Sequence, residues 1–234
     1  MTMTRLFLLS ALALVAGCST PPDYYHTLRP AVASAPTGAR DAQGVLAIGP
    51  VTVPDALARD EWVVRTGDTG ATIYDHQLWT QGLAADVAQA LVDYLNRGGL
   101  PGGLWADAGP TGSGSGADLD RPAPLRVRVQ VLRLDTILAP APAVSDQVRW
   151  TIECLPSDPA LGPVDAGRYR LVRTAVRDAA QPAPAANAGV EEAQQRFDRV
   201  ARAHSETVRL VAGDIADALH TSADERARSC IAGR

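Results

Sequence analysis

The sequence predicts a single α/β domain in which a small, mostly antiparallel sheet packs against two amphipathic helices. Two segments, about 78–97 and 190–219, repeat apolar residues at steps of three and four, as a helix with one buried face does. The shorter segments between them alternate apolar and polar residues or run as β-branched stretches, and Gly and Pro separate them. The domain is expected to span residues 44–222, which suits one hydrophobic core, and a polar tail follows at 223–234.

Residues 1–17 have the pattern of a secretory leader, with Arg5 followed by an apolar run that is too short to span a bilayer. The leader ends in Gly17 directly before Cys18, which resembles the lipobox of bacterial lipoproteins. That resemblance implies cleavage before Cys18 and lipid on its thiol, whereas a plain signal peptide with a chance cysteine is the alternative. By resemblance to lipoprotein sorting in Gram-negative envelopes, Ser19 rather than Asp after the cysteine implies the outer membrane, with the domain facing the periplasm.

Residues 18–43 are rich in Pro, Ala, Ser and Thr and are expected to form a lipidated tether. Within this tether, residues 24–28 form an aromatic and apolar island that can dock as a short edge strand. The net charge of −4 argues against general binding to nucleic-acid backbones, which requires a basic surface. Once Cys18 carries lipid, Cys154 and Cys230 remain, so one disulfide is expected in an oxidising compartment, with two unconnected thiols as the alternative.

The first strands are expected at 45–53, where Pro50 marks a bulge or an edge, and at 61–65 and 71–74. Gly and Asp residues between the last two predict a hairpin turn at 67–70. A helix is expected from about Leu78 to Arg97, with Trp79 in its apolar stripe. Asp86 is among the polar residues expected mainly on the outer side of this helix. The Gly/Ser-rich segment 98–124 is expected to be a flexible loop. A phosphate-binding loop would need a strand before it and a helix start after it, and the sequence predicts neither here.

Three further strands are expected at 125–134, 148–154 and 168–176, joined as an antiparallel meander with one solvent-exposed face. The alternation slips by one residue near Leu132, which indicates a bulge. In the last helix, His204 lies in the apolar stripe, which favours a hydrogen-bonded core or rim histidine over a metal ligand.

Arginines dominate the polar positions of these three strands and make their outer face a candidate docking surface, because the guanidinium group binds acidic groups and lipid phosphates through two bonds. These residues are Arg126, Arg128, Arg149, Arg168, Arg170 and Arg173. The alternative is an ordinary solvated face neutralised by Glu153, Asp135 and Asp165.

The sequence contains no recognised catalytic or metal-binding motif, and its four histidines are scattered. Asp75 and His76 are adjacent in sequence, but neighbouring side chains on a strand point to opposite faces. The sequence therefore predicts no catalytic residue, no metal site and no cofactor apart from the covalent lipid on Cys18.

The order of these motifs resembles the ABC-type transport auxiliary lipoproteins, the family that includes the PqiC type. The resemblance rests on the lipobox, the Tyr24–Leu28 start, the Ile48–Pro54 strand and the Val64–Gly67 to Trp79 stretch, and it spans residues 18 to about 220. The sequence differs from the family pattern in the long loop 98–124 and in the links rich in Ala and Pro.

The resemblance implies an outer-membrane lipoprotein of a mammalian-cell-entry (MCE) type lipid transport system, similar to PqiABC, without catalytic activity. Such a lipoprotein would hold the end of a periplasmic MCE tunnel at the outer membrane and support envelope integrity. Its candidate partner-binding residues are Tyr24, Tyr25, Arg126, Arg128 and Arg149, because tyrosine and arginine dominate binding hot spots. A lipid carrier or outer-membrane assembly lipoprotein with its own cargo cavity, and a hydrolase with an unrecognised site, remain alternatives, and homo-oligomerisation stays open.

Overall fold

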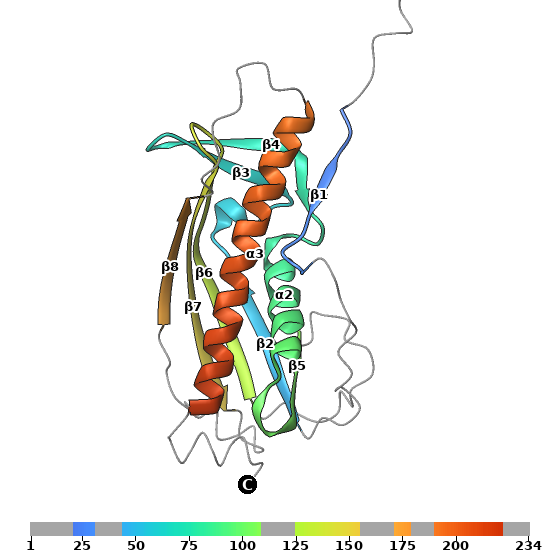
Figure 1. The fold of residues 1–234 in the computed structure, drawn as a ribbon, viewed down its shortest axis with the longest axis vertical. Helices are drawn as coiled ribbons and strands as arrows, with labels where there is room; N and C mark the ends of the chain where they lie inside the picture. The colour runs from blue at the N-terminus through green and yellow to red at the C-terminus, as the bar shows by residue number, and fades with distance from the viewer. Residues whose placement is uncertain (1–20, 31–43, 109–124, 155–170, 179–189, 222–234) are drawn as a thin grey trace, which may run out of the picture.

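The computed structural model describes residues 21–30, 44–108, 125–154, 171–178 and 190–221 (Figure 1). In chain order, the elements are β1 (Tyr24–His26), β2 (Gly44–Thr52), the short 3-10 helix η2 (Asp55–Leu57), β3 (Glu61–Thr66), β4 (Gly70–Trp79), α2 (Leu83–Gly98), the 3-10 helix η3 (Pro101–Gly103), β5 (Leu104–Asp107), β6 (Leu125–Ile137), β7 (Ala143–Cys154), β8 (Leu171–Asp178) and α3 (Val190–Thr221). Part of the expected tether therefore belongs to the sheet. Residues 24–26 of the aromatic and apolar island form the short strand β1, as predicted.

The described strands form one eight-stranded mixed sheet in the order β1-β4-β3-β6-β2-β5, and β7 and β8 continue from β6. Pairings of β1 with β4, of β2 with both β5 and β6, and of β3 with β6 are parallel. Those of β3 with β4, β6 with β7 and β7 with β8 are antiparallel. The single α/β domain is confirmed, but the prediction of a mostly antiparallel sheet is wrong. The chain returns through α2 before β5 and β6 enter the sheet in the direction of β2, as crossover connections allow.

Local strand irregularities follow the sequence closely. The register of β2 against β6 shifts between Ile48 and Val51, so Pro50 marks a bulge as predicted. The register of β6 against β7 shifts between Val131 and Arg133, at the predicted slip. β6, β7 and β8 form the predicted antiparallel meander.

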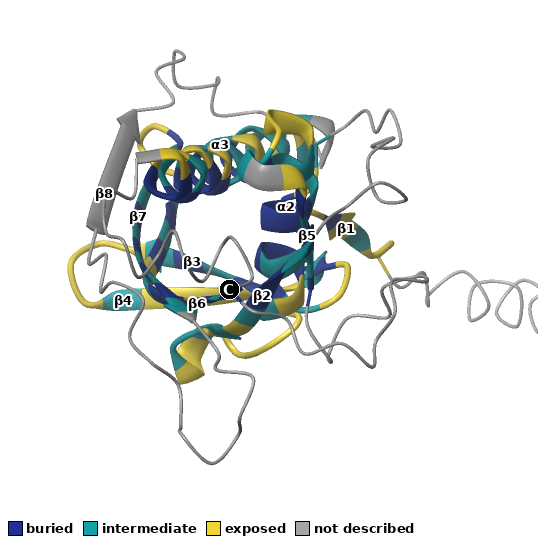
Figure 2. Cartoon of the chain, turned by 90° about the horizontal axis from the view of Figure 1, so that it is seen from below, coloured by how far each residue is buried: buried dark blue, intermediate teal, exposed yellow. Residues whose placement is uncertain are grey.

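Both helices pack on the same side of the sheet, which curls around them (Figure 2). Helix α2 begins at Leu83, later than predicted, because Leu78 and Trp79 belong to β4, where they pair with β1. Gly82 precedes the helix with a φ of +74°, a conformation that favours glycine. Leu78 and Trp79 therefore fit a helical period in the sequence but form a strand, because they pair with β1.

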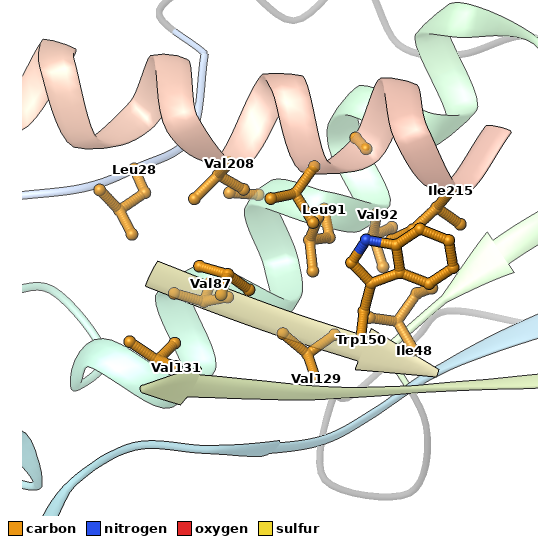
Figure 3. Close-up of a cluster of buried hydrophobic side chains, with 14 of the residues drawn as sticks. Leu28, Ile48, Val87, Leu91, Val92, Val129, Val131, Trp150, Val208 and Ile215 are labelled. Carbon is orange, nitrogen blue, oxygen red and sulfur yellow. The ribbon is translucent and has the colours of Figure 1, made fainter. Parts of the chain in front are cut away.

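The core lies between the helices and the sheet and is built from apolar side chains of both layers (Figure 3). Leu28, just after β1, is completely buried in this core. Ser205 of α3 donates a hydrogen bond of 2.7 Å to the Leu28 carbonyl and lies 2.8 Å from the Tyr94 hydroxyl of α2. The segment after β1 is thus tied to both helices.

Strand β5 lies within the segment 98–124 that the sequence predicts to be a flexible loop, so that prediction is wrong for residues 104–107. Its edge is closed by the side chain of Asn96, from the last turns of α2. The Asn96 amide donates to the Ala106 carbonyl at 2.9 Å, and its oxygen accepts from the Ala106 N–H at 2.8 Å. The remaining residues of that loop, 109–124, lie outside the described residues.

Candidate functional site

The outer face of β6 and β7 carries the predicted arginines on the side of the sheet opposite the helices. Along β6, Leu125, Val127, Val129 and Val131 are buried, and the alternate residues point outward, with Arg128 and Gln130 exposed. The register places Arg126 opposite Glu153, Arg128 opposite Thr151, and Gln130 opposite Arg149. The structure therefore brings Arg126, Arg128 and Arg149 together on one surface, as the alternation predicted. We call these three residues the arginine face.

Among the described residues, the arginine face is only partly neutralised. Arg128 Nε donates to Glu153 Oε2 at 2.7 Å, and Arg149 Nη1 donates to Gln130 Oε1 at 3.5 Å. Arg126 makes no hydrogen bond or ion pair with another described residue, although Glu153 lies opposite it. Within the described ranges, the Arg126 guanidinium therefore has no acidic partner.

The two tyrosines do not join this surface. Tyr25 is 62 % exposed, whereas Tyr24 is half-buried, and both lie on β1. Strands β4 and β3 separate β1 from β6 in the sheet. The predicted partner-binding residues thus form two separate surfaces.

Several predicted site residues fall outside what the structure describes. Cys18, Arg168, Arg170 and Cys230 lie beyond the described ranges. Cys154 ends β7 and Arg173 lies in β8, where only the strand path is described. The lipidation of Cys18 and the disulfide between Cys154 and Cys230 therefore stay predictions.

A chain of buried side chains joined by polar contacts crosses the core near the end of β6. Trp62 Nε1 donates to Thr136 Oγ1 at 2.8 Å. Thr136 Oγ1 lies 2.8 Å from His204 Nε2, and His204 Nδ1 lies 2.8 Å from Asp146 Oδ1. If His204 carries its proton on Nδ1, each group in the chain donates once to the next, ending at the carboxylate. We call these four residues the core relay.

The core relay joins four elements, β3, β6, α3 and β7, and confirms His204 as a hydrogen-bonded core histidine. A carboxylate, an imidazole and a hydroxyl in series is also the order found in hydrolytic triads. Here, however, Thr136, Asp146 and His204 are 0 % exposed, so no substrate reaches the hydroxyl. The arrangement therefore holds the core together. The sequence signal was the alternation Val144, Asp146, Val148, which places a carboxylate on the buried face.

A second polar group lies where β1 meets β4 and α3. His26 Nε2 is 2.7 Å from Gln77 Oε1, and Gln77 Nε2 donates to Gln194 Oε1 at 3.2 Å. His26 also packs edge-on against Trp62, whose ring stacks on Trp79 at a centroid distance of 4.2 Å. These contacts fix the short β1 strand to the domain. Nearby, His76 pairs with Asp23 at 2.8 Å rather than with its neighbour Asp75.

Asp86 of α2 is completely buried, which corrects its expected place on the outer side of the helix. Its carboxylate accepts from Thr80 Oγ1 at 3.0 Å and from Thr27 Oγ1 at 3.2 Å. Burial raises the pKa of the Asp86 carboxyl above its ordinary value, although these hydrogen bonds and the charge of Arg29 oppose the shift. The residue therefore ties the segment after β1 to the start of α2 at an electrostatic cost.

Asp86→Asn is expected to gain stability relative to the wild type as the pH rises. A raised folded-state pKa means that the folded protein holds this proton more tightly than the unfolded chain, whose pKa is near 3.8. The contribution is therefore fully present below the unfolded pKa and is lost as the pH rises through the folded pKa. Urea unfolding of both proteins between about pH 3.5 and pH 7 measures the difference.

Asp55→Asn, on the exposed 3-10 helix η2, controls for the loss of one carboxylate. A free-energy difference between wild type and Asp86→Asn that stays constant or shrinks with rising pH would contradict this prediction.

Among the described residues, no group of three or more His, Cys, Asp or Glu side chains is arranged to hold a metal ion. Within the same ranges, no helix combines the length and the apolar character needed to cross a membrane.

The fold is similar to that of solved structures of low sequence identity. One, described as an uncharacterised protein, is 16 % identical with a TM-score of 0.52, covering 84 % of this chain and 98 % of that chain. Another, XCC0632 from Xanthomonas campestris, assigned to DUF330, is 12 % identical with a TM-score of 0.52, covering 84 % and 93 %. The hypothetical protein CT253 from Chlamydia trachomatis is 15 % identical with a TM-score of 0.42, covering 74 % and 96 %. At such identities the likeness to the first two structures, whose TM-scores are 0.52, concerns the fold alone.

No curated protein matches the chain. The family description "ABC-type transport auxiliary lipoprotein component" matches residues 26–216, from β1 to the last turns of α3. This range contains the arginine face, the core relay and Asp86. The chain therefore belongs to the ABC-type transport auxiliary lipoprotein family and is an auxiliary lipoprotein component of an ABC-type transport system.

Proposed function

We propose that the protein is the outer-membrane member of an MCE-type lipid transport system, anchored by lipid on Cys18, and that its arginine face docks the periplasmic MCE protein. Membership in the auxiliary lipoprotein family supports an association with transporter components. The lipobox-like residues before Cys18 and Ser19 after it support an anchor in the outer membrane. The lipidation of Cys18 and the identity of the MCE partner are both parts of this proposal.

The arginine face is the observation that carries the docking step. It lies on the side of the sheet that the helices leave uncovered (Figure 2). Arg126 has no described partner, and Arg128 pairs with Glu153 at the surface. An acidic partner surface would gain bonds to both guanidinium groups without first breaking a buried ion pair.

Positioning is favoured over carrying cargo, because apolar side chains occupy the space between α3 and the sheet. Figure 3 shows Leu91, Val208 and Ile215 from the helices facing Val129 and Trp150 from the strands. A lipid chain held there would have to displace these buried side chains. The protein is therefore proposed to hold a conduit in place rather than to enclose lipid.

The docking surface is tested with the double variant Arg126→Glu and Arg128→Glu in the membrane-anchored protein. We expect it to lose most of its chemical cross-linking to the MCE protein, because two attractive charges become repulsive. Increasing salt should weaken the wild-type association in the same direction.

The matched control is Arg97→Glu with Arg202→Glu, which reverses two exposed arginines on the helical side of the domain. Circular dichroism should show that both variants keep the fold. If the arginine-face variant cross-links like the wild type, the docking surface lies elsewhere, and Tyr24→Ala with Tyr25→Ala tests the second surface. If the wild type captures no MCE protein, the proposed system itself is wrong.

A further inference from the structure

The end of the domain at which β1 begins carries the most exposed apolar side chains of the described residues. Tyr25 is 62 % exposed, Ile73 44 % and Tyr74 36 %, and they are the exposed large hydrophobic residues of the described ranges. All three lie on β1 or β4. Exposed apolar residues that gather in one region mark a contact surface more often than scattered ones do.

A second apolar segment lies at the same end of the long axis. The connection between β6 and β7, residues 138–142, reads Leu-Ala-Pro-Ala-Pro, and Ala139, Pro140 and Ala141 are exposed. In Figure 1 this connection, the β3–β4 hairpin and the start of β1 all lie at the upper end of the molecule, away from β5 and the end of α3. We call Ile73, Tyr74 and residues 138–141 the apolar end.

A lipid on Cys18 would keep the start of β1 near the membrane. Asp23 is held by His76 of β4 at 2.8 Å, so the chain reaches the domain beside the β3–β4 hairpin. From Cys18 to Asp23 there are five residue steps, which span at most about 18 Å when fully extended. If Cys18 carries lipid, as the proposed function requires, Asp23 cannot lie further than that from the headgroups, and Ile73 and Tyr74 lie on the same strand as its partner His76.

The charges at this end do not favour a specific attraction to anionic lipid. Arg65 donates to Asp135 at 3.2 Å, and Arg133 binds the same carboxylate. Asp68, at the hairpin turn, is exposed and negative. With Arg65 and Arg133 engaged by Asp135, this part of the described surface would meet a lipid surface mainly through apolar and tyrosine side chains, which favour the headgroup level.

We propose that the apolar end rests on the zwitterionic phospholipid headgroups of the membrane that holds the lipid on Cys18. The outer edge of β4 before residue 77 is not paired with β1, so its main-chain groups would stay at the hydrated headgroup level. Resting there would orient the domain with its long axis away from the membrane. The arginine face would then stand to the side, open to a periplasmic partner.

The test is hydrogen exchange of the lipidated protein in phosphatidylcholine vesicles, followed in peptides that cover residues 70–76 and 136–143. We expect exchange several-fold slower than in the same protein with a Gly/Ser spacer of about 30 residues after Thr20, whose root-mean-square length is about 30 Å. Adding anionic lipid should change this little. Ile73→Asp with Pro140→Asp should remove the slowing, whereas Ala85→Asp together with Gln195→Asp, at exposed helix positions, should leave it intact.

Equal exchange with and without the spacer, in protein that stays on the vesicles, would reject this contact and leave the lipid anchor standing. Protein that does not stay on the vesicles would overturn the anchor and this proposal together. Slowing that occurs without vesicles and depends on protein concentration would assign the apolar end to a second copy of the chain and would also reject the lipid contact.

Discussion

Replacing His204 with alanine should lower the free energy of unfolding by about 3–5 kcal/mol, because it leaves the buried Asp146 carboxylate without its partner. Thr136 would lose an acceptor at the same time. The Asp146 Oδ2 atom already has no described hydrogen-bond partner, so the carboxylate depends on His204 for its compensation. Urea unfolding at neutral pH, followed by circular dichroism, measures the loss.

His220→Ala is the matched control, since this exposed histidine lies on the same helix. It should change the stability by less than about 0.5 kcal/mol. Asp146→Ala should destabilise strongly, and the double variant should lose clearly less than the sum of the two single losses, because the second change removes a group that the first has already left unpaired. Additive losses would show that the two side chains do not depend on each other.

Replacing Cys18 with alanine should abolish labelling with palmitate and release the protein from the membrane fraction. A single acyl chain gives only marginal membrane binding, at about 0.8 kcal/mol per buried methylene, whereas several chains on one residue hold a protein lastingly. Among the described residues, no helix would replace that anchor. Labelling in cells followed by membrane fractionation checks both outcomes.

Ser19→Ala is the control for this change, because it alters the neighbouring residue and leaves the thiol in place. It should keep both the label and the membrane location. Equal labelling of the wild type and Cys18→Ala would show that the cysteine after Gly17 is not the lipidated residue.

The sequence predicted the elements whose signal is local. The apolar steps of three and four in α3, the phase slip near Leu132 and the position of Pro50 each depend on residues that are close in sequence, and each is confirmed. The arginine face follows from the same local alternation, because Arg126 and Arg128 share a phase. Local pattern thus predicts which face of an element is buried.

Features that depend on distant partners were not predictable in this way. The parallel direction of β2 and β6 is set by the path through α2, which no strand pattern records. Trp79 fits a helical period with Leu83, but pairing with His26 holds it in β4. Asp86 can lie on the buried side of α2 because the hydroxyls of Thr27 and Thr80 donate hydrogen bonds to its carboxylate. The core relay likewise requires four segments to meet.

The clasp of Asn96 on β5 limits how the sheet can grow. A free edge strand offers unpaired N–H and C=O groups to any extended chain, and this is how strands from separate molecules join into larger sheets. At Ala106 both groups are already taken by a side chain from the same domain. At this position a partner protein or a second copy therefore cannot add a strand through main-chain hydrogen bonds, and recognition there has to rely on side chains.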